Sequence, residues 1–377
     1  MEPSSNQPAN FVHLIGDSTL DNIWHHQKNK GSRENPDFDI NDAKIASVEG
    51  KLHQAFKQNN SKNKYKIINH AYDGFTTTSV LNGDYVGRVF FGIHWTELAS
   101  RKDNHKFIAY QSDKKNIKDI RQKVQPLESL KESIENHKED NHYVVLSVGG
   151  NDFRKNLFNP VQLFRNIFTV QKRYLEIVSK IQEMKSDNIK PILMFQYRTD
   201  ANSDSNKIYK ILKVVGVLAA TIQTLSFAAI AIAGVKWHHG NFTKNTSLKI
   251  ILLSLSLLYG TTRFVPLKNI KNILLGRHIG VSTFGCLLEK LYQPMLEKAK
   301  KDQIPVLDLS NSFNPFDNLL YTQSIEPNEK GSELIANGIS YIVKDYENFK
   351  GKTVIHSDIG EYKIRSIIPK KWEVAYP

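Results

Sequence analysis

Residues 11–18 read Phe-Val-His-Leu-Ile-Gly-Asp-Ser, a short apolar run that ends in a glycine, an acid and a serine. An apolar run of four to eight residues that stops at turn residues is typical of a buried strand. Similar runs recur along the chain. The sequence therefore predicts a set of short buried strands, at Phe11–Ile15, Tyr65–Asn69, Tyr143–Val148, Pro191–Tyr197 and Ile304–Leu309.

Helical patterns separate these strands. The alternation of strand and helix predicts crossover connections, and hence a three-layer α/β/α fold around a mainly parallel five-stranded sheet. In open sheets of this kind, ligands bind beyond the carboxyl ends of the strands. The predicted helices are Ala43–Lys57, Leu127–His137, Pro160–Lys185, Leu287–Lys301 and Glu329–Tyr346.

The composition excludes some classes of protein. The net charge of +13 comes from lysines scattered among polar residues, which indicates a solvated surface or attraction to anionic lipid; nucleic acid is not expected as a partner. The single cysteine, Cys286, excludes an intramolecular disulfide and favours a reducing compartment. No metal-binding or phosphate-loop spacing is present, so no cofactor is expected.

Residues 208–266 break the alternation with two apolar runs. Val214–Val235 is 22 residues long without a formal charge, which is enough for a transmembrane helix. Ile250–Thr262 covers only about 20 Å as a helix, so Lys249 and Arg263 would have to snorkel for it to cross. Because α/β elements flank the region on both sides, the number of crossings must be even. The prediction is a transmembrane helical hairpin, with a buried hairpin or an interfacial lid as the alternative.

The charges around the hairpin predict its orientation. Basic residues are more frequent on its outer flanks than in its connecting loop, and the positive-inside rule then places the folded domain in the cytoplasm. The protein is thus expected in a membrane, with two crossings. The outer flanks carry Lys207, Lys210, Lys213, Arg263, Lys268, Lys271 and Arg277, and the connecting stretch carries Lys236, Lys244 and Lys249.

The rest of the chain divides around this hairpin. Residues 1–10 are polar, are expected to be disordered, and lack the apolar core of a signal peptide. The α/β domain would comprise 11–207, with a charged insertion at 84–125, and 267–346. The tail, 347–377, alternates apolar and polar residues and predicts a small appended β-hairpin. The oligomeric state has no signal in the sequence.

Chemically useful residues follow the predicted strands in order. Ser18 follows the first strand, and Gly74, in Asp-Gly-Phe-Thr-Thr, follows the second. Asn151 follows the third in Gly-Gly-Asn-Asp, and Glu326 lies in Ile-Glu-Pro-Asn before the last helix. An asparagine amide and freed backbone N–H groups are suitable oxyanion donors. Each feature alone also has a plain structural interpretation, such as a helix cap for Ser18 or a turn for Gly74.

The order of these blocks resembles the SGNH/GDSL hydrolase family, over roughly residues 11–200 and 285–345. The resemblance implies a flavodoxin-like fold and an ester hydrolase. It also implies that Ser18 is the nucleophile, and that Gly74 and Asn151 complete an oxyanion hole with the Ser18 backbone N–H.

The fourth block departs from the family pattern. Where the family has D-x-x-H, this chain has Gln323 and Glu326, and it resembles a subgroup that reads I-E-P-S there. A serine hydroxyl needs a base. Three hypotheses stay open: Glu326 is the base, with a pKa raised by burial; a histidine from elsewhere replaces it; or the site binds an ester without turnover. The histidines considered are His13, His25, His26, His70 and His356.

The sequence therefore predicts a membrane-anchored serine esterase or lipase that acts through an acyl-serine intermediate, with a lipid or acylated molecule as one candidate substrate. The alternative is a catalytically silent binding or scaffold protein that keeps the SGNH shape at a membrane. The two hypotheses differ in whether Ser18 reacts.

Overall fold

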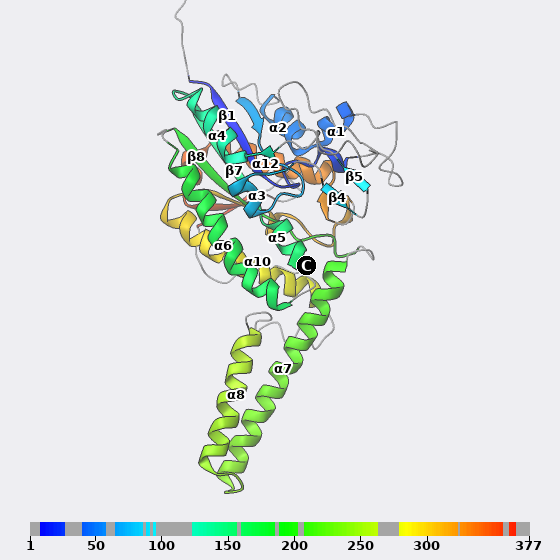
Figure 1. The fold of residues 1–377 in the computed structure, drawn as a ribbon, viewed down its shortest axis with the longest axis vertical. Coiled ribbons are helices and arrows are strands. Elements are labelled where there is room, and N and C mark those ends of the chain that lie inside the picture. The colour runs from blue at the N-terminus through cyan, green and yellow to red at the C-terminus, as the bar shows by residue number, and fades with distance from the viewer. Residues whose placement is uncertain are drawn as a thin grey trace, which may run out of the picture.

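The computed structural model describes residues 8–26, 40–57, 65–85, 88–90, 93–95, 123–156, 160–184, 188–202, 207–262, 279–322, 325–356 and 362–366. A twisted sheet covered by helices forms one end of the molecule, and two long helices project from that end (Figure 1). Most of the predicted disordered N-terminus, 1–7, lies outside the described residues.

The main sheet has seven strands, in the order β13-β12-β9-β8-β7-β1-β2. All described neighbours pair in parallel except β12 and β13, which are antiparallel. The first five strands of the chain to enter this sheet have the order 2-1-3-4-5, which is flavodoxin-like. The strands are β1 (Asn10–Gly16), β2 (Tyr65–Asn69), β7 (Asn141–Ser147), β8 (Ile189–Phe195), β9 (Val306–Asp308), β12 (Lys352–His356) and β13 (Tyr362–Ser366).

All five predicted strands are present, but the predicted five-stranded sheet is too small. The tail does form a hairpin, as predicted, yet its first strand pairs in parallel with β9 through Thr353 and Val354. Val354 is fully buried, so the tail extends the main sheet rather than standing apart from it. Residues 367–377 lie outside the described residues.

Helices cover both faces of the sheet. One face packs against α3 (Thr77–Asn82), α4 (Pro126–Glu135), α6 (Pro160–Gln182) and α10 (Ile279–Lys301), and the other against α2 (Val48–Lys57) and α12 (Glu329–Lys344). Strand side chains alternate between the two layers, as a pleated strand requires. In β1, Ile15 packs on the first layer and Leu14 on the second. The predicted three-layer architecture is confirmed.

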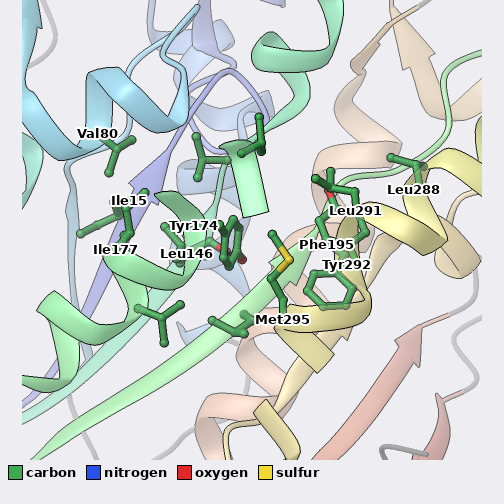
Figure 2. Close-up of a cluster of buried hydrophobic side chains, with 14 of the residues drawn as sticks. Ile15, Val80, Leu146, Tyr174, Ile177, Phe195, Leu288, Leu291, Tyr292 and Met295 are labelled. Atoms are coloured by element: carbon green, nitrogen blue, oxygen red, sulfur yellow. Dashed lines mark hydrogen bonds between the residues drawn. The ribbon is translucent and has the colours of Figure 1, made fainter. Parts of the chain in front are cut away.

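The first of these two cores is shown in Figure 2, where side chains from α6 and α10 meet the sheet. The rings of Phe195 in β8 and Tyr292 in α10 stack with centroids 4.1 Å apart. The Tyr292 hydroxyl accepts a hydrogen bond from the backbone N–H of Gln196, at 2.8 Å. The helix that follows the hairpin is therefore an integral part of the domain core.

Two predicted helices are interrupted. The predicted helix Ala43–Lys57 is α1 (Ile40–Ala46) followed by α2, because Ser47 bonds the Lys44 carbonyl and caps the next turn by accepting from Gly50 N–H. The predicted helix Glu329–Tyr346 ends at Lys344, and a short helix, α13 (Tyr346–Phe349), follows Asp345.

A helical hairpin joins β8 to α10. It consists of α7 (Lys207–His238) and α8 (Lys244–Thr262), which pack against each other and extend away from the domain (Figure 1). Among the described residues, one helix, over Tyr209–His238, is long and apolar enough to cross a membrane. The two helices of the predicted hairpin are present and in contact, and their crossing of a membrane stays a prediction. Residues 263–278, which lead back to α10, lie outside the described residues.

Most of the predicted insertion at 84–125 also lies outside the described residues. Its described parts are short antiparallel pairs, β3 (Asp84–Tyr85) with β6 (Lys123–Val124) and β4 (Arg88–Phe90) with β5 (Ile93–Trp95).

Candidate active site

The candidate site lies where β1 and β7 end. At the end of β1, Gly16 passes so close to β7 that a side chain there would overlap the carbonyl oxygen of Ser147. The next residue, Asp17, donates its N–H to that carbonyl at 3.1 Å. Only glycine permits this close approach. It fixes the position of the turn that carries Ser18.

Ser18 does not cap an α-helix, which was the plain structural interpretation of this residue. Residues 18–20 form a turn, followed by a single-turn 3-10 helix, η1 (Ile23–His25). The side chains that would continue a helix are used elsewhere: Asn22 accepts from Val48 N–H at 3.0 Å and donates to the Ser332 hydroxyl at 2.7 Å. The turn is thus tied to α2 and α12.

The side chain of Ser18, in this turn, contacts the side chain of Glu326. The Ser18 hydroxyl donates a hydrogen bond to Glu326 Oε1 at 3.2 Å, and both side chains are buried, with 7% and 6% exposed. They are 308 positions apart in sequence. The other carboxylate oxygen, Oε2, is buried without a hydrogen-bond partner in the described part of the chain.

Asn328 holds the turn around Glu326 in place. Its side chain caps α12 by accepting from Gly331 N–H at 3.0 Å, and it donates to the Leu319 carbonyl at 2.7 Å. β11 (Glu326–Pro327) pairs with β10 (Tyr321–Thr322), which fixes Glu326 opposite Thr322. These contacts fix the Ile-Glu-Pro-Asn block and therefore the position of the Glu326 carboxylate.

Asn151 lies beside Ser18 at the start of α5 (Gly150–Asn156). Its amide nitrogen donates to the Phe75 carbonyl at 3.1 Å, and because an amide has two N–H hydrogens, a second one remains for a ligand. Gly74 adopts φ +76, which favours glycine. Thr77 joins this turn to α5 by donating its N–H and hydroxyl to the two Asp152 carboxylate oxygens, each at 2.8 Å.

A cavity of about 60 Å³ opens in front of Ser18. Ser18, Asn151 and Glu326 line it; Gly74, the fourth predicted residue, is described but is not among the lining residues. The polar wall also includes Arg154 and Gln196. The remaining wall is mainly apolar, and much of it comes from α10, the helix that follows the hairpin. Its apolar members are Phe153, Phe284, Leu288, Leu291, Tyr292 and Ile325.

Burial sets the protonation of both acids in the site. Desolvation raises the pKa of Asp17 to about 7, although the Thr19 N–H and the Gln196 amide bond its carboxylate. Desolvation likewise raises the pKa of Glu326, while the His25 imidazole lowers it, Asp73 raises it, and Arg154 and the Ser18 hydrogen bond lower it. A base whose pKa is raised toward neutrality is better matched to proton transfer at pH 7.

The five histidines considered from sequence occupy different places. His25 Nε2 lies 4.0 Å from Glu326 Oε1 and 3.5 Å from Asp73 Oδ2. His26 contacts Asn22 and Ser332. His13 and His70 belong to a buried chain of imidazoles that continues to His142. His356 ends β12 and donates its backbone N–H to the Ser312 hydroxyl. Of the five, His25 is the one placed next to the predicted site.

Sequence reasoning missed several residues of this site. Asp73 precedes Gly74 in the second block, where only the glycine is a motif residue. The Asp73 backbone N–H donates to Asp21 Oδ2 at 3.1 Å. Gln196 follows β8 without a motif, yet it bonds both Asp17 and the Ser147 hydroxyl. The signal for Gln196 was its position at a strand end. No sequence signal predicted that α10 lines the cavity, because this position depends on how the chain returns from the hairpin to the domain.

No group of three or more His, Cys, Asp or Glu side chains suited to a metal ion occurs among the residues that the structure describes. The site is an arrangement of a hydroxyl, carboxylates and amide donors. Such groups suit acyl transfer by a serine.

Comparisons with known proteins add little to this geometry. No protein-family model matches the chain, and no curated protein matches it. Solved structures with a similar trace include an aryl esterase of M. smegmatis in an inhibitor-bound form, with 10% identity and a TM-score of 0.41 over 89% of this chain and 99% of that one. A carbohydrate acetylesterase family member from Sinorhizobium meliloti has 11% identity and a TM-score of 0.37, over 89% and 98% of the two chains. At these scores the likeness does not assign a function.

Proposed function

We propose that this protein is a membrane-anchored serine ester hydrolase of the SGNH/GDSL type, with Ser18 as nucleophile and Glu326 as its base. The observation that carries the proposal is the 3.2 Å contact from the Ser18 hydroxyl to a buried carboxylate, inside a cavity that Asn151 also lines. The subgroup motif with glutamate in the fourth block agrees with this assignment.

The chemistry follows from the contacts. Ser18 Oγ attacks the ester carbonyl carbon while its proton moves to Glu326 Oε1. Asn151, with the backbone N–H group of Ser18, stabilises the oxyanion; Gly74, which does not line the cavity, is left out of this step. The C–O bond then breaks, and the proton on Glu326 moves to the leaving alkoxide. In the second half, water gives one proton to Glu326 while its oxygen attacks the acyl-serine carbonyl carbon. The bond from that carbon to Ser18 Oγ then breaks, and the proton on Glu326 returns to Oγ, which releases the acid and restores Ser18.

The cavity favours a small acyl group. A volume of about 60 Å³ is roughly four times what one water-sized probe needs, and its wall is mainly apolar. The acyl part of the ester would lie against Phe284 and Leu288, with the alcohol part outside. Short-chain esters should therefore be hydrolysed faster than long-chain ones, whether the alcohol is a lipid headgroup or a soluble molecule.

The hairpin supports the membrane part of the proposal. Its exposed side chains are large and apolar, as with Leu225 and Leu253, each 64% exposed, whereas Gln223 and Ser247 are fully buried between the helices. The Ser247 hydroxyl donates to the Ala233 carbonyl of the other helix at 3.3 Å. Apolar surfaces outside and small or polar contacts inside are the pattern of helix pairs in bilayers. With the basic flanks noted above, we infer two crossings and a cytoplasmic domain.

The root of the hairpin also touches the cavity wall. Tyr209, near the start of α7, packs its ring edge-on against Phe284 of α10, with centroids 6.0 Å apart, and donates its hydroxyl to the Thr199 carbonyl at 2.7 Å. Phe284 and Thr199 both line the cavity. The candidate site therefore opens near the end of the domain from which the hairpin leaves, and an ester at the membrane surface is a suitable substrate.

A labelling experiment tests the enzymatic claim. The full-length protein in detergent should react with a fluorophosphonate, and Ser18→Ala should abolish both labelling and p-nitrophenyl acetate hydrolysis. Glu326→Gln should lower the turnover by about 100-fold to 10,000-fold, the usual range for a general base. Ser340→Ala, a buried serine of α12 that bonds the Asn337 carbonyl, is the matched control and should label normally. Absence of labelling at any pH would instead favour the silent binding protein.

A topology experiment tests the anchor. A glycosylation or protease-protection reporter near Thr243, in the hairpin loop, should lie on the opposite side of the membrane from one at the C-terminus. Both reporters on one side would exclude two crossings and leave a surface-bound hairpin.

A further inference from the structure

Glu326 has a second close neighbour besides Ser18. His25, at the end of η1, places Nε2 4.0 Å from Glu326 Oε1 and 3.5 Å from Asp73 Oδ2. The four side chains thus follow one another in the order Ser18, Glu326, His25, Asp73, from three separate parts of the chain. The His25 side chain is 10% exposed, so bulk water screens its charge only weakly.

The loops that carry His25 and Asp73 are fixed to each other. Asp21, four residues before His25, accepts the Asp73 N–H on Oδ2 at 3.1 Å. Asn22 anchors η1 to α2 and α12, as described above, and the His25 backbone N–H bonds the Asn22 carbonyl at 2.9 Å. The Asp-Asn pair that follows Gly16-Asp17-Ser18 in the first block therefore serves to place an imidazole beside Glu326.

We propose that His25 and Asp73 are positioning residues for the base: the His25 imidazolium beside Glu326 keeps it ionised, ready to accept the Ser18 proton, and the Asp73 carboxylate, which orients the imidazole, opposes that effect on Glu326. This inference rests on the proposed function. It differs from a role for His25 as the base itself, because the Ser18 hydroxyl bonds Glu326. The proton moves between Ser18, Glu326 and the leaving group, and His25 keeps its own proton throughout.

The physical need for a cation comes from burial. A carboxylate removed from water is neutralised unless a positive charge or hydrogen bonds stabilise it. Glu326 accepts one hydrogen bond, from Ser18, and its Oε2 has none from the described residues. The His25 imidazolium is the largest favourable charge acting on it, and Arg154 is the next. Without His25, much of the protein would hold a protonated Glu326 that cannot accept a proton.

The other titratable groups around this pair do not replace that charge. Asp17, after β1, has a pKa of about 7, so it is largely neutral below pH 7. The pKa of Tyr197, after β8, is raised well above its usual value by burial, so it is neutral as well. His26 faces His25 from the same loop, and burial lowers its pKa to about 4. The charges that act on Glu326 are therefore those of His25, Asp73 and Arg154.

The test uses the pH profile of kcat/KM for p-nitrophenyl acetate, whose acid limb reports ionisation of the base in the free enzyme. His25→Gln removes a cation, so the acid limb should move to higher pH by about 1 unit or more. Asp73→Asn removes an anion that raises the pKa of Glu326, so its acid limb should move to lower pH. Opposite shifts are a readout that a purely structural role would not produce. His53→Gln, at an exposed histidine of α2, is the control.

The outcomes separate this inference from the proposed function. If Ser18 fails to react with fluorophosphonate in the unaltered protein, the proposed function is wrong. If Ser18 reacts but both variants lose rate without opposite limb shifts, the role of His25 and Asp73 is wrong. An infrared titration of the protonated carboxyl band, assigned by its loss in Glu326→Gln, reads the same shift without turnover. A band with the same midpoint in His25→Gln as in the unaltered protein overturns the proposal.

Discussion

The α/β domain and the α7–α8 hairpin bury opposite kinds of side chain. In the domain, Tyr174, Phe195 and Tyr292 lie inside the sheet–helix layers with almost no exposed surface. In the hairpin, Gln223 and Ser247 are buried, and Leu225 and Leu253 are exposed. The burial of apolar surface stabilises the first arrangement in water. The second arrangement leaves its large apolar side chains exposed and gains no such stabilisation from water. If the hairpin lies in a bilayer, as proposed, the same substitution should have different effects in the two regions.

The largest contrast should come from placing a charge in each region. Ile192→Asp puts a carboxylate into the fully buried centre of β8 and should unfold the domain, because an unpaired buried charge costs more than the stability of most proteins. Leu253→Asp, on the exposed face of α8, should leave the fold and the esterase activity in detergent intact. It should weaken retention in liposomes by about 100-fold, from a cost of about 3 kcal/mol in a bilayer. Circular dichroism and liposome flotation measure the two effects.

Retention of Leu253→Asp in liposomes at the level of the unaltered protein would contradict the bilayer assignment. The matched substitution Leu253→Ala separates loss of apolar area from the added charge.

The pH dependence of stability should belong to the domain alone, since the apolar run Val214–Val235 holds no titratable group. The raised Asp17 pKa of about 7 contributes stability below the unfolded pKa near 4, and this is lost as pH rises to about 7. The lowered His13 pKa of about 2 has the opposite effect, with stability gained as pH rises to about 6.5. Asp17→Asn should remove the first slope, so between pH 4 and 6.5 its stability should rise relative to that of the unaltered protein by about 1.4 kcal/mol per pH unit.

Urea unfolding of both proteins across this pH range, in detergent, measures the difference. Parallel curves for Asp17→Asn and the unaltered protein would show that Asp17 is ionised in the folded state.

Two glycine substitutions give the smallest contrast. Gly16→Ala would bring a methyl group into the Ser147 carbonyl and should cost about 3 kcal/mol, with loss of labelling at Ser18. Gly234, in α7, has no atom within 4 Å of the corresponding position, so Gly234→Ala should stabilise the helix by about 1 kcal/mol. Thermal unfolding followed by ellipticity compares them; a stabilised Gly16→Ala would refute the close approach of β1 to β7.

The sequence predicts best where the signal is local. Each of the five strands is an apolar run bounded by turn residues, and Ser18 and Asn151, placed at two of the strand ends, line one cavity, whereas Gly74 does not. The sequence predicts less well where contacts with neighbouring residues or strands determine the structure. The helix that the sequence continues through Ser47 is broken by a hydroxyl cap, and β12 is a strand of the main sheet because β9 leaves an edge for it.

The same division holds within the candidate site. A motif could point to Glu326 because its block is contiguous, from Ile325 to Asn328. It could not choose among five histidines, because the 4.0 Å from His25 to Glu326 depends on Asn22 and Asp21 being tied to other loops. Gln196 and the α10 wall were missed for the same reason.

By itself, the sequence determined that strands and helices alternate, that polar blocks follow the strands, and that a long uncharged helix interrupts the domain. These follow from hydrophobic periodicity and turn chemistry, which depend on residues close together in the chain. Only the tertiary structure decided which carboxylate contacts Ser18, which histidine lies beside that carboxylate, and that Gln223 and Ser247 of the hairpin are buried. Each of these is a contact between segments distant in sequence, fixed by the parallel order of the sheet and by the packing of its helices.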